Sequence, residues 1–309
     1  MISYLTDLLD KIKKLLYKNP LFPVKIKIIL ERRFFKMKFH LKKAAKKDAE
    51  SITRNHTVPL LHVEQIEKYY GNQGAVTKAL NQISFDVQGG EFISIMGASG
   101  SGKTTLLNCI STIDTISSGH IFLDNKDITT INEDDIAAFR RDHLGFVFQD
   151  FHLLDTLTLE ENIALPLTIR NLPPKEIHER VSHMAEQLQI SEILKKFPTQ
   201  VSGGQQQRCA FARAVICNPK LLLADEPTGS LDSHSSRILL EIISKFNQEA
   251  KVTILMVTHD AFSASYAKRI LFLKDGQIFN EIRKGEKTRS TFYHEILDVL
   301  SLLGGDRLC

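Results

Sequence analysis

The sequence predicts an α/β fold with a parallel-sheet core, and two patterns support this prediction. Short apolar segments at residues 92–96, 221–224, 253–257 and 270–273 alternate with segments of helical periodicity, as in a parallel sheet. The first of them runs directly into a glycine-rich loop, which a helical pattern follows. The chain has 309 residues, of which 43% are hydrophobic, so it can bury one large core or two modest ones.

The glycine-rich loop reads GASGSGKT and matches the phosphate-binding pattern G-x-x-x-x-G-K-[ST]. Its glycines let backbone N–H groups face phosphate oxygens, and a helix beginning near Gly102 directs its positive dipole end at the same anion. Lys103 supplies positive charge for the terminal phosphates, and the Thr104 hydroxyl is placed to ligate Mg²⁺. The predicted phosphate-binding residues are Gly97, Ala98, Ser99, Gly100, Ser101, Gly102, Lys103, Thr104 and Thr105.

A simple Gly/Ser-rich turn is the alternative interpretation of this loop. The apolar strand before it and the apolar helix after it favour a nucleotide site. The loop alone does not distinguish kinases, GTPases and ATPases.

Residues 1–57 differ from the rest of the chain in charge. Residues 1–56 contain 15 Lys/Arg and 5 Asp/Glu, a net charge of +10, whereas the remainder has a net charge of −6. Apolar residues recur at helical spacing through residues 2–18. We interpret residues 1–57 as a basic, partly amphipathic extension. It is an interfacial helix with a polybasic tail on anionic lipid, an accessory extension, or a segment translated from a start codon upstream of the true one.

The remaining composition argues for an intracellular protein without its own membrane span. No apolar run approaches the length that crosses a bilayer, and no signal-peptide pattern is present. The four cysteines have no metal-ligand spacing, so we expect free thiols: Cys109, Cys209, Cys217 and Cys309.

The predicted elements follow in order from Pro59. Strands are expected at 60–70 and 79–87, near 120–123 and at 144–148, and a helix near 133–141. Residues 157–200 form a separate helical block, with one helix opened by Pro173-Pro174. TFYHEILDVLSLL near the C-terminus predicts a final amphipathic helix.

The strand at 221–224 delivers two acids to its C-terminal end, where ligands bind in open α/β sheets. Asp225 is placed to hold Mg²⁺. Glu226 is placed beside a γ-phosphate, where it can accept a proton from the attacking water. An apolar run followed by an acid is a weak signal alone, but its pairing with a phosphate loop makes it strong.

The segment VSGGQQQRCAFARA provides a second candidate anion site. It can be read simply as a helix start with Ser202 as N-cap. It can also be read as an anion cradle formed by Ser202 and Gly204 N–H groups at a helix N-terminus. One nucleotide needs one such cradle, so the second suggests a phosphate held by another copy of the chain.

SGGQ between a phosphate loop and LLLADEP resembles the signature motif of ABC transporter ATPases. The resemblance implies a P-loop NTPase fold with an antiparallel β subdomain and an inserted α-helical subdomain at about residues 150–205. It implies that Tyr70 stacks on adenine, that Gln149 touches the metal and senses a transmembrane partner, and that His259 contacts the γ-phosphate. The other implied nucleotide contacts are Ser202, Gly203, Gly204, Gln205 and, in a loop that crosses a dimer interface, Asp232.

The resemblance also points to a particular subfamily. From about Val58 to the C-terminus, the chain is similar to the bacitracin-type peptide-resistance transporters of Gram-positive bacteria. Among the strings that carry it are IMGASGSGKTTLLN, HLGFVFQDFHLLDTLTLEENIALPL and ADEPTGSLDS. The family implies an ATPase homodimer on the cytoplasmic face of the membrane, bound to a permease and often working with a sensor histidine kinase. In that family, the ATPase and its permease together remove antimicrobial peptides from lipid-linked cell-wall targets.

Two rival functions remain open at this point. A related ATPase for lipoprotein release or cell division would carry nearly the same motifs. A soluble ABC protein acting on DNA or ribosomes is disfavoured, because one cassette occupies one chain and the basic N-terminal stretch lacks aromatics on a stacking face. We therefore expect no nucleic-acid partner.

Overall fold

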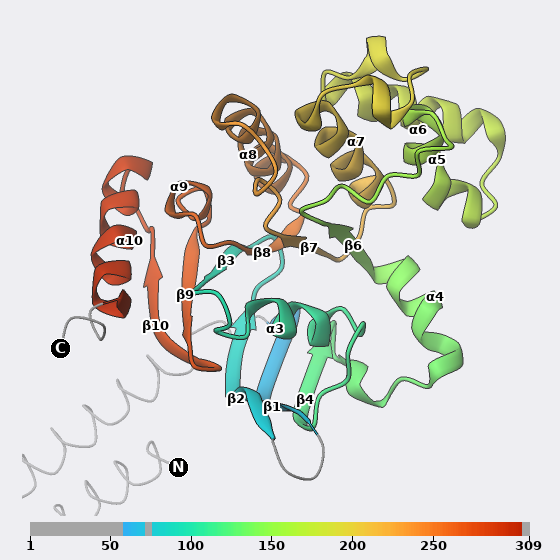
Figure 1. The fold of residues 1–309 in the computed structure, drawn as a ribbon. Coiled ribbons are helices and arrows are strands. Elements are labelled where there is room, and N and C mark those ends of the chain that lie inside the picture. The colour runs from blue at the N-terminus through green and yellow to red at the C-terminus, as the bar shows by residue number, and fades with distance from the viewer. Residues whose placement is uncertain (1–57, 72–75, 305–309) are drawn as a thin grey trace, which may run out of the picture. The chain divides into compact units, whose positions relative to one another are not determined.

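The computed structural model describes residues 58–71 and 76–304 (Figure 1). The predicted interfacial helix at residues 2–18 and its polybasic tail lie outside the described residues. Within the described part of the chain, no helix is both long and apolar enough to cross a membrane.

A four-stranded antiparallel sheet contains the first strands of the described chain. Its order is β2-β1-β4-β5, with bounds β1 Leu61–Tyr70, β2 Thr77–Val87, β4 Ser118–Leu123 and β5 Lys126–Asp127. Ile83, Phe85 and Val87 of β2 are buried while the residues between them are exposed, because successive side chains in a strand point to opposite faces. The strands predicted at 60–70, at 79–87 and near 120–123 are confirmed.

A six-stranded sheet forms the second layer, in the order β10-β9-β3-β8-β7-β6. All neighbours in it are parallel except β10, which runs antiparallel to β9. All five residues of β3 and all five of β8 are buried, as expected where helices or a second sheet cover both faces. The bounds are β3 Phe92–Met96, β6 Leu144–Val147, β7 Leu221–Asp225, β8 Thr253–Val257, β9 Arg269–Lys274 and β10 Gln277–Arg283.

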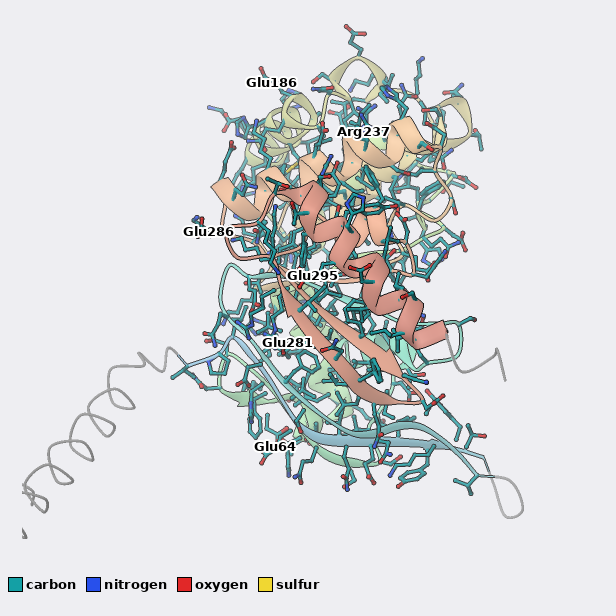
Figure 2. All side chains as sticks on the ribbon, turned by 90° about the vertical axis from the view of Figure 1, so that its left-hand side faces the viewer. Glu64, Glu186, Arg237, Glu281, Glu286 and Glu295 are labelled. Atoms are coloured by element: carbon teal, nitrogen blue, oxygen red, sulfur yellow. The ribbon has the colours of Figure 1, made fainter. Side chains whose placement is uncertain are left out.

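The predicted alternation of parallel strands with helices is confirmed, but β10 was not anticipated from the sequence. It is an edge strand that returns from β9 through Asp275 and Gly276, both of which have positive φ. Its outward side carries Glu281 (Figure 2), whose carboxylate pairs with Arg269 at 2.9 Å and with Arg283 at 2.8 Å. The strand is therefore held by edge ion pairs as well as by main-chain pairing.

The helices pack against these sheets through three apolar clusters. The helices are α3 Lys103–Ile110, α4 Glu133–His143, α5 Leu159–Ile169, α6 Pro174–Gln187, α7 Gly203–Val215, α8 Ser233–Glu249, α9 Ala261–Ala264 and α10 Arg289–Gly304, with short 3₁₀ turns η1 Ile128–Thr130, η2 Ser191–Ile193 and η3 Pro198–Gln200. One apolar cluster lies between the two sheets and includes α3. A second joins the parallel sheet to α5, α6, α7 and α8, and a third joins β3 and β9 to α9 and α10.

The predicted helical block is confirmed as α5, α6, η2 and η3, inserted between β6 and α7 (Figure 1). Pro174 occupies the first turn of α6, where a missing N–H costs nothing. Thr158 and Glu161 form a capping box at the start of α5. The fully buried Asn162 fixes the incoming chain, since its Nδ2 donates to Leu154 O, Leu157 O and Thr158 O and its Oδ1 accepts from the Leu154 N–H.

We expect Asn162→Ala to lower the free energy of unfolding by about 2–3 kcal/mol, because it removes all four hydrogen bonds of a fully buried amide, including those to the Leu154 N–H and the Leu157 carbonyl. Urea denaturation checks this value. Thr168→Ala, at an exposed position of the same helix, should change it by less than about 0.5 kcal/mol. Equal midpoints for Asn162→Ala and the unsubstituted chain would show that this amide does not organise the block.

Candidate active site

The phosphate loop begins where β3 ends, at the carboxyl edge of the parallel sheet. Gly97 and Gly102 are required by their surroundings. A Cβ at Gly97 would lie 2.3 Å from Leu273 O, and one at Gly102 would lie 2.6 Å from Ala79 O. Gly102 is also the N-cap of α3 with φ of 100°. The loop therefore closes tightly on β2 and β9, and its helix begins at the predicted position.

Lys103 is the first residue of α3, and its ammonium lies inside the loop. Its Nζ donates to Gly97 O at 3.0 Å and to Ala98 O at 2.8 Å, and the residue is only 7% exposed. Burial lowers the pKa of Lys103, although the carboxylates of Glu226 and Asp225 act in the opposite direction. The positive charge is thus held where a phosphate oxygen could replace the loop carbonyls.

Asp225 ends β7, next to β8 in the sheet. Its Oδ1 is buried and has no hydrogen-bond partner among the residues that the structure describes. Burial raises the pKa of Asp225, as does the neighbouring Glu226 carboxylate, while Lys103 lowers it. An unpartnered carboxylate oxygen at this edge is a suitable ligand for a hard cation.

The donor set at this edge fits Mg²⁺ shared with a substrate phosphate. Among the described residues, no group of three or more His, Cys, Asp and Glu side chains could hold a metal by itself. Mg²⁺ is commonly bound by one or two carboxylates together with substrate phosphates and water. Asp225 and the Thr104 hydroxyl, which lines the adjoining cavity, would supply the protein oxygens.

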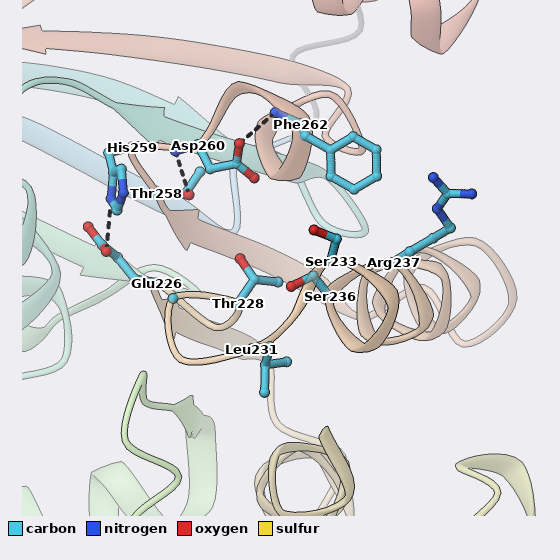
Figure 3. A pocket seen from close by; sticks show the side chains of 11 residues that line it. Glu226, Thr228, Leu231, Ser233, Ser236, Arg237, Thr258, His259, Asp260 and Phe262 are labelled. Atoms are coloured by element: carbon cyan, nitrogen blue, oxygen red, sulfur yellow. Dashed lines mark hydrogen bonds and ion pairs between the residues drawn. The ribbon is translucent and has the colours of Figure 1, made fainter. Parts of the chain in front are cut away.

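Glu226 and His259 face each other across two neighbouring loops (Figure 3). Glu226 Oε2 lies 2.9 Å from His259 Nδ1. Glu226 has φ of 45°, an uncommon value for a side chain of its size, and its N–H donates to Val257 O at 2.9 Å. This backbone bend after β7 turns the carboxylate toward the residue that follows β8.

Two cavities meet at the Glu226–His259 pair. The larger, of about 710 Å³, lies over the phosphate loop; the smaller, of about 450 Å³, extends toward α8 and α9. The larger contains the predicted Ser99, Gly100, Gly102, Lys103, Thr104 and Thr105 together with Glu226 and His259. It also contains residues that sequence reasoning missed: Thr77, Lys78, Ala79, Asp275 and Gly276.

The structure does not bring every predicted residue into these cavities. Among the predicted site residues, those that line neither cavity are Tyr70, Gln149, Asp225, Asp232, residues 202–205 and, in the phosphate loop, Gly97, Ala98 and Ser101. Tyr70, at the end of β1, is 42% exposed, and its hydroxyl donates to Asp114 Oδ2. The Gln149 side chain packs against Gly229. The predicted nucleotide contacts of these residues stay predictions.

The SGGQ turn is a capped helix start, as one of its two interpretations predicted. Ser202 is the N-cap of α7, and its Oγ accepts from the Gln205 N–H at 3.4 Å. In return, Gln205 Oε1 accepts from the Ser202 N–H at 2.9 Å. One of the two N–H groups expected to bind an anion is therefore already paired, and Gln205 would have to move to release it. Asp232 likewise caps α8, accepting from the His234 and Ser235 N–H groups.

Two residues of α7 that sequence reasoning missed join this turn to the active site. The buried Gln207 donates through Nε2 to Phe148 O at 2.9 Å and to Pro227 O at 2.6 Å. Arg213 donates to Phe151 O and His152 O. They hold the loop around Gln149 and the segment after Glu226 on one helix. Polar residues on the buried face of a helix were the only signal for them.

Comparison with known proteins gives consistent findings. The family model described as ABC transporter matches residues 80–229. The ABC transporter ATP-binding protein YxdL of Bacillus subtilis (strain 168) is 52% identical over 247 residues, covering 80% of this chain and 95% of the relative. The bacitracin export ATP-binding protein BceA of Halalkalibacterium halodurans is 47% identical over 246 residues, covering 80% and 97%.

Solved structures agree. A dimeric post-hydrolysis state of the ATP-binding cassette MJ0796, bound to ADP and Pi, has a TM-score of 0.67 at 36% identity; it covers 72% of this chain and 98% of that one. The cbiO1 subunit from Clostridium perfringens has a TM-score of 0.68 at 28% identity, covering 81% and 96%.

We expect Asp225→Asn to raise the melting temperature of the nucleotide-free protein at pH 7.5. The pKa of Asp225 is raised in the folded state, so ionisation opposes folding increasingly as the pH rises above the ordinary pKa of aspartate, and fully once the pH exceeds the raised pKa. The gain from Asp225→Asn should therefore shrink as the pH falls and disappear below the ordinary pKa, where both states are protonated. Differential scanning calorimetry at several pH values measures it.

Asp142→Asn is the matched control, because its hydrogen bond with Arg141 lowers the pKa of Asp142. That substitution should not raise the melting temperature. A melting temperature for Asp225→Asn below that of the unsubstituted protein at pH 7.5 would contradict this account.

Proposed function

The chain belongs to the ABC transporter family, and we propose that it drives a separate permease that exports antimicrobial peptides of the bacitracin type. It is an ATP-binding subunit and an ATPase. The observation that most supports the finer proposal is the 47% identity to a bacitracin export ATP-binding protein over 97% of that relative. Matching along nearly the full relative covers the surfaces that would meet a permease as well as the nucleotide motifs.

ATP would bind along the phosphate loop. Backbone N–H groups of residues 97–102 and the N-terminus of α3 would bind its phosphates. Lys103 would exchange its bonds to Gly97 O and Ala98 O for bonds to phosphate oxygens, which adds charge-assisted hydrogen bonds at an already buried ammonium. Thr105 would contact the same nucleotide, and Tyr70 would stack on its adenine.

Mg²⁺ would be held by Thr104 and Asp225, with Gln149 approaching from its position against Gly229. When bound, the cation supplies charge neutralisation for the phosphate oxygens. The unpartnered Asp225 Oδ1 supports this assignment.

Hydrolysis would use the Glu226–His259 pair. Glu226 Oε2 would accept the proton of the attacking water, while His259 would contact the γ-phosphate. Their 2.9 Å contact supports a joint role, because His259 holds the carboxylate at the border of both cavities. The reaction consumes one water and yields ADP and inorganic phosphate.

We propose a homodimer in which each ATP is shared. Ser202, Gly203, Gly204 and Gln205 of one copy would bind the phosphates held by the other, and Asp232 would lie at the crossing loop. The solved dimer of a similar cassette with ADP and Pi supports this arrangement. ATP would favour the closed dimer because it contacts both copies only in that state.

The permease would receive this motion through Gln149 and the helical block α5–α6. Gln207 and Arg213 support that route, since they fasten the Gln149 loop to α7. The chain would then lie at the cytoplasmic face of the membrane through its permease. A sensor histidine kinase would work alongside it, as the family resemblance implies. A lipoprotein-release or cell-division role is the alternative. The chain is also similar to cassettes not described as bacitracin exporters, such as a macrolide export protein and MJ0796, so family membership alone does not decide between these roles.

Glu226→Gln should retain ATP binding and lose nearly all turnover, on the order of a hundredfold or more, because an amide cannot accept the proton. It should also accumulate as a dimer in the presence of ATP. Steady-state phosphate release, ATP titration calorimetry and size-exclusion chromatography measure the three effects. Turnover close to that of the unsubstituted chain would remove Glu226 from the catalytic role.

In the native host, Glu226→Gln should lower the inhibitory concentration of bacitracin severalfold and leave division and lipoprotein localisation intact. An affinity tag on the unsubstituted chain should co-purify one integral-membrane partner. Unchanged bacitracin tolerance combined with a division or lipoprotein defect would favour the alternative function.

A further inference from the structure

Tyr70 is held by two charged side chains that have no part in the site described so far. Its hydroxyl donates to Asp114 Oδ2 at 2.5 Å, and Lys68 Nζ lies 4.9 Å from the centre of its ring. Lys68 Nζ donates in turn to Asp114 Oδ1 at 2.5 Å and to Thr115 O at 2.6 Å. The two oxygens of one carboxylate therefore bind the phenol and the ammonium together.

The burial of these groups differs in a way that suits a binding platform. Lys68 is only 8% exposed, whereas Tyr70 is 42% exposed. A desolvated ammonium interacts more strongly with an aromatic ring than a hydrated one does. Lys68 is thus largely protected from solvent, while much of Tyr70 stays accessible to a ligand.

Asp114 connects this anchor to the phosphate loop through α3. The N–H groups of Ile113 and Asp114 both donate to Asn108 O, at 3.0 and 3.1 Å, so Asp114 is fixed to the C-terminal turn of α3. The same helix begins at Lys103. The position of the Tyr70 ring is therefore set relative to the phosphate loop by one short helix.

We propose that Lys68 and Asp114 are positioning residues that hold the Tyr70 ring at a fixed place relative to the phosphate loop. The base and the triphosphate of one ATP can then bind without first ordering the tyrosine, which would otherwise reduce affinity. This inference rests on the proposed function, in which Tyr70 stacks on adenine. Lys68 and Asp114 would act on base affinity and not on the chemical step.

Tyr69 provides a matched comparison within the same strand. Its hydroxyl donates to Glu67 Oε2 at 2.9 Å, and Lys78 Nζ lies 5.3 Å from its ring centre. It is 39% exposed. Its hydroxyl partner, however, lies on β1 itself, so the contact does not connect the ring to α3.

The experiment compares Tyr70→Phe, Asp114→Asn, Tyr70→Ala and the control Tyr69→Phe in the purified full-length chain. ATPase assays give kcat and KM for ATP, and inhibition by inorganic tripolyphosphate gives the affinity for a ligand without a base. We expect Tyr70→Phe and Asp114→Asn to raise KM for ATP about threefold to tenfold with kcat within about twofold. Tyr70→Ala should raise KM at least about tenfold, because stacking is also lost. The tripolyphosphate inhibition constant should remain unchanged in these variants, and the control Tyr69→Phe should leave both KM and kcat unchanged.

Each other outcome separates the proposal from the function on which it rests. If Tyr70→Ala raises KM but Tyr70→Phe and Asp114→Asn do not, stacking stands and the positioning role is overturned. If Asp114→Asn weakens the binding of ATP and of tripolyphosphate equally, Asp114 supports the whole site structurally, and the positioning role is again overturned. An unchanged KM in Tyr70→Ala removes Tyr70 as the base platform, while ATP hydrolysis itself stands. If the unsubstituted chain fails to hydrolyse ATP, the proposed function fails first.

Discussion

The parallel pairing of β3, β8 and β7 is the constraint on which the rest of the site depends. Ile95 pairs with Val257, and Val257 pairs with Asp225, so the three strands end at nearly the same level. The next residues along each strand therefore emerge at one edge. This alignment delivers the phosphate loop, the two carboxylates and His259 to one place from segments far apart in the sequence. Burial of β3 and β8 on both faces keeps the alignment rigid.

Two charged groups at this edge, Asp225 and Lys103, have no ion-pair partner in contact with them among the described residues. Asp225 has a buried oxygen without a partner, and Lys103 turns to the carbonyls of its own loop. Both groups have a pKa that burial shifts toward the neutral form. A phosphate with its cation would relieve both at once, so the groups that destabilise the empty site are those proposed to bind the nucleotide.

Much of this arrangement could be predicted because it is encoded locally. The loop at 97–104, the acids after an apolar strand and the Ser202 cap are contiguous patterns, each of which can be recognised within one short stretch of sequence. The edge strand β10 was missed because its only apolar residues, Ile278, Phe279 and Ile282, do not alternate with polar ones. Lys78, Gln207 and Arg213 were missed for another reason: their partners lie on other elements, and only the folded chain brings them together. The paired Ser202 N–H was equally invisible, since a capping box and an anion cradle use the same residues.

The central claim is that a complete nucleotide site needs two copies of the chain. The most direct test is crosslinking between Ser99→Cys in the phosphate loop and Ser202→Cys in the SGGQ turn, both exposed positions. Each substitution is placed in a separate preparation that also carries Glu226→Gln. On mixing with a short bis-maleimide, the account predicts a covalent heterodimer that forms with ATP and is lost without it. The absence of this product with ATP bound, together with turnover per chain that does not change on dilution to monomer, would contradict the account.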